Sequence, residues 1–209
     1  MSGLPRLLAQ LLYNRHIADP AQAEAFLAAD RRLESDPGLL PDIDKAVPRI
    51  RHALAAGEKM AVYGDFDLDG VAATATMVQG LIGLRGNVIP YIPHRFDEGY
   101  GLNQRALDSL AQQGVTLIIT VDCGTSASAE VAYASNIGVD VIVTDHHSVP
   151  DSLPLALAII NPKRDGCSYP SRDLSGAGVA FKLLQALYGE LAPDSGPDYL
   201  LDMVALGTV

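Results

Sequence analysis

The chain has few cationic residues and few cysteines. It contains 15 Lys and Arg residues against 25 Asp and Glu residues, a formal net charge of −10 over 209 residues. This balance argues against a protein that binds nucleic acid mainly through Lys and Arg side chains on its surface. It does not exclude a nuclease whose metal ions or other domains supply positive charge. Cys123 and Cys167 form neither a CxxC pair nor a disulfide framework, and the reducing cytoplasm fits them best.

Long apolar runs are also absent. No apolar stretch reaches the roughly 18 residues needed to span a bilayer, so we expect no membrane partner. The short apolar stretch near the N-terminus is not followed by a small-residue cleavage site, so we expect no secretion signal. Hydrophobic residues nevertheless make up 48% of the sequence, and such a composition predicts a chain with a substantial buried core.

The periodicity of the sequence changes at about residue 57. Before that point, Leu, Ala and Ile recur at spacings of three and four, which predicts helices over residues 4–15, 20–29 and 43–56. From Lys59 onward, short apolar strands alternate with helices, and this pattern predicts a parallel sheet with helices on both faces. We therefore expect an α/β domain in residues 58–209, preceded by a small helical region in residues 1–57. The expected strands cover residues 59–64, 87–93, 115–122, 139–145 and 155–161.

Three acidic residues, Asp65, Asp67 and Asp69, follow the first expected strand at every second position, and we call them the acidic triplet. An extended backbone would direct the three carboxylates to one side, with Gly70 turning the chain into the next helix. Such like charges repel one another, and a hard divalent cation such as Mg²⁺ or Mn²⁺ removes the repulsion. The alternative is a turn in which Asp caps the helix, which explains one or two of the three acids.

Polar residues also end the third and fourth expected strands. Asp122 ends the third, and taken alone it is expected to cap the helix opened by residues 123–125 more often than to bind a ligand. Asp145, His146 and His147 end the fourth, and two consecutive histidines after an Asp are a stronger sign of a site. Because ligands bind outside the carboxyl ends of parallel strands, we expect these groups to meet the acidic triplet.

This combination of carboxylates and imidazoles has a chemical preference. It favours Mn²⁺, Mg²⁺, Fe or Zn over Ca²⁺, and the absence of thiolates from the set disfavours a structural zinc site. The set is large enough for two metal ions, which would clamp a phosphate and generate a hydroxide nucleophile.

A glycine-containing turn precedes one of the expected helices. Ser175, Gly176 and Gly178 lie where the exposed amides of a helix start attract anions such as phosphate. Close helix packing explains the glycines equally well.

Two loops add candidate contacts to nucleic acid. In residues 94–102, Arg95 could pair with a phosphate and Phe96 or Tyr100 could stack on a base, although a solvated loop explains the segment equally well. Residues 161–165 offer two further cations, and a polar turn is their simpler interpretation.

Four motifs resemble those of the DHH phosphoesterase superfamily in order and spacing: YGDFDLDG, ITVDCG, TDHH and SGAGVAFK. The helical start of the chain, the loop IPHRFDEGYGLN and the segment beginning INPKRDGCSYP further resemble the branch that digests single-stranded DNA. The resemblance covers nearly the whole chain. It implies a 5′→3′ exonuclease of DNA repair and recombination that uses one or two Mn²⁺ or Mg²⁺ ions.

The resemblance also implies roles for individual residues. The metal ligands would be Asp67, Asp69, Asp122 and His146, with Asp65 in or beside the coordination shell. The catalytic residues would be Asp145 and His147, and His147 would contact the scissile phosphate. Arg95 and the turn of Ser175, Gly176 and Gly178 would meet DNA phosphates, and the products would be mononucleotides with a 5′-phosphate.

The chain departs from the family pattern at two places. Tyr63 stands where these enzymes often carry His. The family also continues after LGTV with Ala-Asp, whose Asp is another metal ligand, whereas this chain stops at Val209. We therefore expect an N-terminal fragment, truncated before its last metal-ligand motif and weak or inactive by itself.

The resemblance implies single-stranded DNA as the partner, together with a single-strand-binding protein and a helicase, in the cytoplasm. Two alternatives stay open. One is a DHH phosphodiesterase that cuts short oligonucleotides or cyclic dinucleotides, or a related pyrophosphatase. The other is a non-catalytic module of the same fold that only binds.

Overall fold

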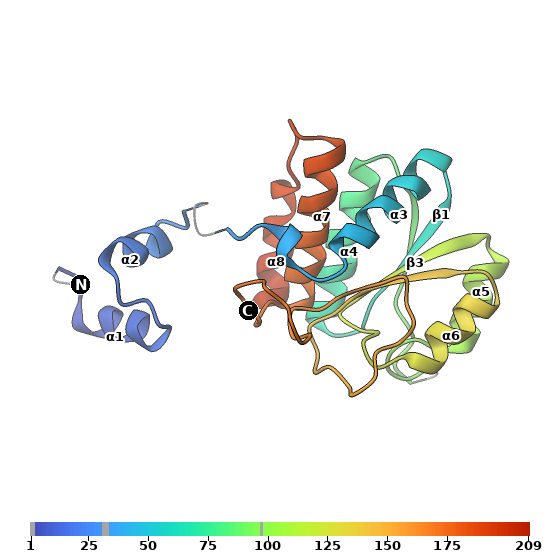
Figure 1. The fold of residues 1–209 in the computed structure, drawn as a ribbon, viewed down its shortest axis with the longest axis horizontal. Helices are drawn as coiled ribbons and strands as arrows, with labels where there is room; N and C mark the ends of the chain where they lie inside the picture. The colour runs from blue at the N-terminus through green and yellow to red at the C-terminus, as the bar shows by residue number, and fades with distance from the viewer. Residues whose placement is uncertain (1–2, 31–33, 97) are drawn as a thin grey trace. The chain divides into compact units, whose positions relative to one another are not determined.

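The computed structural model describes residues 3–30, 34–96 and 98–209, and its contacts divide the chain between Asp36 and Pro37 into two compact units (Figure 1). The small unit holds α1 (Arg6–Asn14) and α2 (Pro20–Leu27). As predicted, α2 begins after Asp19, whose carboxylate accepts the Gln22 N–H at 2.9 Å. A carboxylate in this position satisfies an amide that the helix itself leaves unpaired.

The larger unit begins with η2 (Pro37–Leu39) and α3 (Ile43–Ala56). Helix α3 ends at Ala56, and the next residue, Gly57, has the left-handed φ of 64° that glycine readily adopts after a helix. Apolar residues of α3, such as Ile50, belong to the same buried cluster as the sheet and α7 (Gly176–Leu191). Residues 37–57 therefore pack with the sheet, although the change in sequence pattern lies at their C-terminal end.

A five-stranded parallel sheet forms the centre of the larger unit, in the order β2-β1-β3-β4-β5. The strands are β1 (Lys59–Tyr63), β2 (Asn87–Tyr91), β3 (Val115–Val121), β4 (Asp140–Thr144) and β5 (Ala158–Ile160). All five lie within the predicted segments. Strand β3 is buried at every position except Thr116, as expected for a central strand covered on both faces.

Helices cover both faces of the sheet, as predicted (Figure 1). One face carries α3 and α7 together with α4 (Leu68–Gly83) and α8 (Leu201–Thr208), which follows η3 (Asp198–Leu200). The other face carries α5 (Gln104–Gln112) and α6 (Ser128–Asn136). Within the described ranges, no helix is both long and apolar enough to cross a bilayer.

The strand order decides where a ligand can bind. From β1 the chain crosses to β2 on one side, and it then returns to β3 on the other side of β1. The connection that follows β1 therefore leads toward one edge of the sheet, and the connection that follows β3 leads toward the other edge. The carboxyl ends of these two strands are the usual binding place in such a sheet.

An ion-pair network joins α3 to the opposite, amino end of the sheet. Arg49 lies 2.8 Å from Glu58, just before β1, and 2.7 Å from Asp140 at the start of β4. The Thr116 hydroxyl donates to Glu58 at 2.6 Å. The hydrogen bond from Arg49, with that from Thr116, lowers the pKa of Glu58 below its ordinary value of 4.5.

We predict that Glu58→Gln lowers the free energy of unfolding by about 1–3 kcal/mol near neutral pH, because charged hydrogen bonds to Arg49 are lost. A carboxyl whose pKa is lowered in the folded state stabilises the fold above its unfolded pKa, and this contribution is lost as the pH falls through the folded pKa. The difference in the free energy of unfolding between variant and wild type, measured by urea denaturation, should thus become smaller in acid. An equal gap at neutral and acidic pH would show that the charge of Glu58 does not stabilise the fold.

Candidate metal centre

The acidic triplet does not stay extended, so its three carboxylates are not aligned along one side of a strand. Strand β1 ends at Tyr63 and α4 begins at Leu68. Asp67 is the N-cap of α4, where its Oδ1 accepts the Gly70 N–H at 2.9 Å, and Asp69 lies in the first helical turn. The capping alternative therefore holds for Asp67, because its carboxylate satisfies an amide at the helix start.

Gly70 serves packing rather than a turn. A Cβ at this position would lie 2.6 Å from both the Cβ and the carbonyl oxygen of Asp65. The missing side chain lets the first turn of α4 close over Asp65 and bury it. Burial raises the pKa of Asp65, and the neighbouring charge of Asp67 adds to the increase.

Asp122 follows β3 in a left-handed conformation with φ 60°. Asp tolerates this backbone better than most residues, and the Asp122 N–H donates to the Thr144 carbonyl at 3.0 Å. The predicted capping role was wrong, because α6 begins at Ser128 and its N-cap is Ala127. The turn instead holds a carboxylate that is 1% exposed at the carboxyl end of the central strand.

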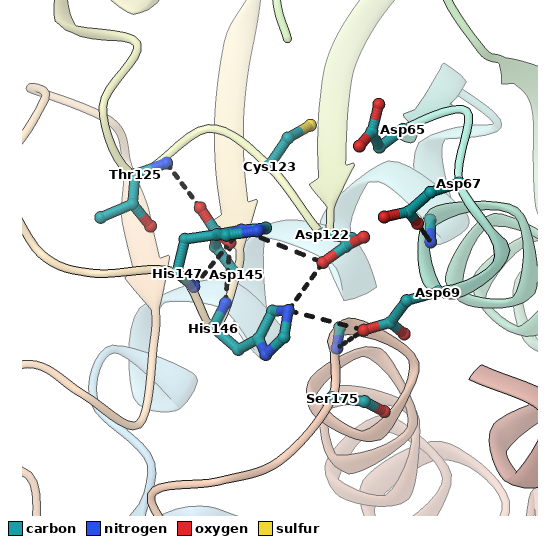
Figure 2. A network of polar contacts seen from close by, with 12 residues as sticks. Asp65, Asp67, Asp69, Asp122, Cys123, Thr125, Asp145, His146, His147 and Ser175 are labelled. Carbon is teal, nitrogen blue, oxygen red and sulfur yellow. Dashed lines mark hydrogen bonds and ion pairs between the residues drawn. The ribbon is translucent and has the colours of Figure 1, made fainter. Parts of the chain in front are cut away.

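Three carboxylates meet at the predicted binding place between β1 and β3 (Figure 2). Asp65, Asp67 and Asp122 each offer an oxygen, and these atoms lie within 4.8 Å of one another. Burial raises the pKa of Asp122, against the opposing attraction of His146. The predicted convergence of acids from distant strand ends is therefore present in the structure.

His146 stands beside this cluster. Its Nε2 lies 2.9 Å from Asp122 Oδ1 and 3.5 Å from Asp69 Oδ2 (Figure 2). Hydrogen bonding to Asp122 is the largest influence that raises the pKa of His146. Among the residues described, Asp122 Oδ1 is nevertheless left without an aligned hydrogen bond.

Asp145 is engaged in a different way. Its Oδ1 accepts the His146 N–H at 2.7 Å and lies 2.8 Å from His147 Nδ1, while its Oδ2 accepts the Thr125 N–H at 2.9 Å. Although burial acts to raise it, the hydrogen bonds from His147 and Thr125 lower the pKa of Asp145 to about 2. Asp145 is thus an ionised, buried group that holds His147, and the same bond raises the pKa of His147.

The backbone N–H groups at the start of α7 donate hydrogen bonds to other residues of this chain. Gly176 N–H donates to Asp69 Oδ2 at 2.7 Å, and Ala177 N–H donates to Asp69 Oδ1 at 2.8 Å. The Gly178 N–H donates to Ser175 Oγ at 3.1 Å. The anion at this helix start is therefore the carboxylate of Asp69. Phosphate binding by Ser175, Gly176 and Gly178 stays a prediction, and a phosphate would compete with Asp69 for the amides of Gly176 and Ala177.

Close packing accounts for Gly176. A Cβ there would lie 2.6 Å from both Cβ and Oδ1 of Asp122, whereas a Cβ at Gly178 would lie no closer than 3.5 Å to any neighbour. The start of α7 is thus pressed against the buried carboxylate of the cluster.

The loop of residues 94–102 reaches the rim of the site, apart from residue 97, which lies outside the described residues. The Arg95 guanidinium lies 5.0 Å from the centre of the Phe66 ring. Tyr100 meets Phe66 and His147 edge to face, with 6.4 Å between ring centres in each pair. Phe96 is largely exposed. A cavity of about 500 Å³ adjoins His147 and Tyr100.

Other candidates have structural roles. The Tyr63 hydroxyl donates to the Gly101 carbonyl at 2.9 Å and accepts from Asn103 at 3.2 Å, so it anchors the loop. Arg164 pairs with Asp42 at 2.6 Å, which favours the polar-turn interpretation for that residue.

Two residues near the histidines had no predicted role. Thr125 donates its backbone N–H to Asp145, and Asn161 donates its side-chain amide to the carbonyl of His147. Asn161 directly follows β5, and a polar residue at a strand end was the available signal.

The donor set fits a hard divalent cation. The buried carboxylates of Asp65 and Asp122 have raised pKa values, and His146 is the nearest ion-pair partner of Asp122 among the described residues, so negative charge remains that a cation can relieve. Cys123, the other candidate ligand type nearby, is buried, and its Sγ contacts the Tyr63 carbonyl at 3.8 Å. Oxygen donors with one imidazole suit Mn²⁺ and Mg²⁺.

Comparisons with known proteins show which family and which relatives the chain is similar to. Residues 59–208 match the DHH family, N-terminal domain. The chain is 44% identical over 203 residues to the single-stranded-DNA-specific exonuclease RecJ of Bacillus subtilis, an alignment that covers 97% of this chain and 25% of that protein. The chain therefore spans about a quarter of the length of this curated relative.

Solved structures with a similar fold include metal-bound exonucleases. The crystal structure of exonuclease RecJ bound to manganese matches with a TM-score of 0.74 and 37% identity, over 81% of this chain and 43% of that one. RecJ from Thermus thermophilus in complex with Mg²⁺ matches with a TM-score of 0.60 and 28% identity, over 97% of this chain and 24% of that one. The similarity of the fold thus extends to proteins that bind both expected ions.

We predict different effects on stability for substitutions at two nearby glycines in α7. Gly176→Ala should lower the free energy of unfolding by about 1–3 kcal/mol, because its Cβ collides with Asp122. Gly178→Ala has room for its Cβ and should leave that free energy unchanged or raise it by up to about 1 kcal/mol. Chemical denaturation of both variants measures the difference, and equal effects would contradict the packing role of Gly176.

We also predict that Asp122→Asn separates metal affinity from stability. Asn also tolerates the left-handed backbone, so the fold persists, while the lost charge weakens Mn²⁺ binding by more than about tenfold. Because the substitution removes a buried charge, the unfolding temperature of the metal-free variant, measured with a chelator present, should equal or exceed that of wild type. Calorimetric Mn²⁺ titration tests this against Asp151→Asn, the same change at an exposed site. Equal Mn²⁺ affinity in the two variants would remove Asp122 from the ligand set.

Proposed function

Because the chain belongs to the DHH family, we propose that it carries the metal-dependent site of a single-stranded-DNA-specific exonuclease. The observation that carries the proposal is the meeting of Asp65, Asp67 and Asp122 at the carboxyl ends of β1 and β3. The substrate comes from the names of the exonucleases to which nearly the whole chain is similar.

In this proposal the ligands of one or two Mn²⁺ or Mg²⁺ ions are Asp67, Asp69, Asp122 and His146, with Asp65 in or beside the coordination shell. Asp67 and Asp69 each donate oxygen lone pairs beyond those used by backbone amides, because a carboxylate has about four acceptor sites. A bound divalent cation supplies Lewis acidity toward the phosphate and lowers the pKa of a coordinated water.

His147 is the proposed contact to the scissile phosphate, with Asp145 as its catalytic partner. The Nδ1 of His147 is bonded to Asp145, so Nε2 is the ring nitrogen that remains for a phosphate oxygen. The low pKa of Asp145 keeps that carboxylate charged, and a charged partner stabilises a protonated imidazole that donates to the phosphate.

The rim of the site is the proposed place for the 5′ end of the DNA. Arg95 would pair with a phosphate, Tyr100 would stack on a base, and the turn of Ser175, Gly176 and Gly178 would bind a further phosphate. The contacts of Arg95 and Tyr100 with Phe66 support this role, because they hold a cation and an aromatic ring beside the acidic cluster. Digestion would proceed 5′→3′ and release mononucleotides with a 5′-phosphate.

The biological setting belongs to the same proposal. An enzyme that digests single-stranded DNA from one end would serve DNA repair and recombination in the cytoplasm, where free cysteines such as Cys123 persist. A helicase that exposes single strands and a single-strand-binding protein are its expected partners.

We predict that Asp67→Asn in the complete protein lowers Mn²⁺-dependent digestion of 5′-labelled single-stranded DNA by at least about 100-fold, the effect of losing a few kcal/mol of transition-state stabilisation. Asn is as good an N-cap as Asp, so α4 keeps its start. The matched control is Asp19→Asn, which makes the same change at the N-cap of α2 and should digest DNA like wild type. Similar activity in both variants would remove Asp67 from the site.

The substrate panel distinguishes the alternatives. Long single-stranded DNA, dinucleotides, cyclic dinucleotides and pyrophosphate are compared with the wild-type complete protein. Preference for long strands supports the proposal, and preference for a short substrate replaces it with a small-substrate phosphodiesterase or pyrophosphatase. Absence of both hydrolysis and Mn²⁺ binding would leave a binding module.

A further inference from the structure

A closed ring of hydrogen bonds lies behind His147. Asp145 Oδ1 lies 2.8 Å from His147 Nδ1, and Asp145 Oδ2 accepts the Thr125 N–H at 2.9 Å. Asn161 Nδ2 lies 3.1 Å from Thr125 Oγ1 and 3.0 Å from the His147 carbonyl oxygen. The path thus runs from His147 through Asp145, Thr125 and Asn161 and back to His147.

Asp145, Thr125 and Asn161 are buried and hydrogen-bonded, whereas the His147 side chain is 49% exposed. Thr125 and Asn161 are both 0% exposed. Asn161 uses its amide group for two acceptors, and its Oδ1 accepts the Lys163 N–H at 2.9 Å. A buried network with all its partners is rigid, and removal of one partner leaves another buried group unpaired.

The ring joins three segments that are separate in sequence. Thr125 follows β3, Asp145 and His147 follow β4, and Asn161 follows β5. His147 is held at two points, because Asn161 binds its backbone carbonyl and Asp145 binds its ring. Both the position of the backbone and the rotation of the imidazole are thereby set.

We propose that Asn161 and Thr125 are positioning residues that aim His147 Nε2 at the phosphate. The inference rests on the proposed function for its effect on the reaction, although the hydrogen bonds exist without it. Neither residue needs to touch substrate or metal. Partners that orient a functional histidine in this way typically change activity by about 10–100-fold when removed.

The kinetic test uses substitutions at Thr125. Thr125→Val keeps the shape but removes the hydroxyl that accepts from Asn161, so kcat on 5′-labelled single-stranded DNA should fall by about tenfold. KM and the calorimetric Mn²⁺ affinity should change less than about twofold, because no metal or DNA contact is lost. Thr125→Ser retains the hydroxyl and should restore most of kcat. Asn161→Leu removes both donors and should lower kcat further.

Thr76→Val is the matched control. Thr76 is also a buried threonine, and within the described chain its hydroxyl has no hydrogen-bond partner. This substitution removes a buried hydroxyl outside the ring and should leave kcat unchanged. Loss of kcat in Thr76→Val equal to that in Thr125→Val would overturn the proposal, as would wild-type kcat in both Thr125→Val and Asn161→Leu.

A second readout does not depend on activity. Long-range ¹H–¹⁵N spectra of the histidine rings in the full chain should show a single ring state of His147, protonated at Nδ1, in wild type and Thr125→Ser, and a mixture of ring states in Asn161→Leu. An unchanged His147 spectrum in Asn161→Leu would contradict the positioning role. A wild-type protein that shows this signature but digests no DNA would refute the proposed function and leave the ring intact.

Discussion

The carboxylate of Asp69 caps the first turn of α7, and the geometry of the site depends on this contact. Both of its oxygens accept amides of that turn, so the segment after β1 is joined to a helix more than a hundred residues away. The contact presses Gly176 against Asp122 and holds Asp69 within 3.5 Å of His146. The positive end of the α7 dipole stabilises the negative charge of Asp69, which lies among several other carboxylates that repel it.

The remaining carboxylates divide into two kinds according to their donors. Asp145 receives hydrogen bonds from the chain on both oxygens and stays ionised, with a pKa of about 2. Asp65 and Asp122 are buried with fewer donors, and their pKa values are raised. The fold therefore supplies hydrogen-bond donors to the charged carboxylate of Asp145. It supplies fewer donors to Asp65 and Asp122, whose negative charge a divalent cation can compensate.

Much of the fold follows from patterns that act over short distances. The alternation of apolar strands with helices indicated a parallel sheet covered on both faces, because each element has to bury its own apolar side. The meeting of Asp65, Asp122 and His146 could also be expected, since the carboxyl ends of parallel strands share one edge. The errors arose where local rules compete. Asp67 occupies a capping position that bends the chain into α4, and Asp122 occupies a left-handed turn instead of a cap.

By itself, the sequence determined which side chains are available and at which edge of the sheet they gather. Only the tertiary structure decided what each one binds. The turn of Ser175, Gly176 and Gly178 has the pattern of an anion site, yet the anion there is the carboxylate of Asp69, which belongs to a helix distant in sequence. Gly176 has no room for a side chain because Asp122 lies against it. Asn161 reaches His147 only because β5 lies next to β4. Hydrogen bonds and steric contacts act over a few ångströms, so residues distant in sequence acquire these roles only when packing brings them together.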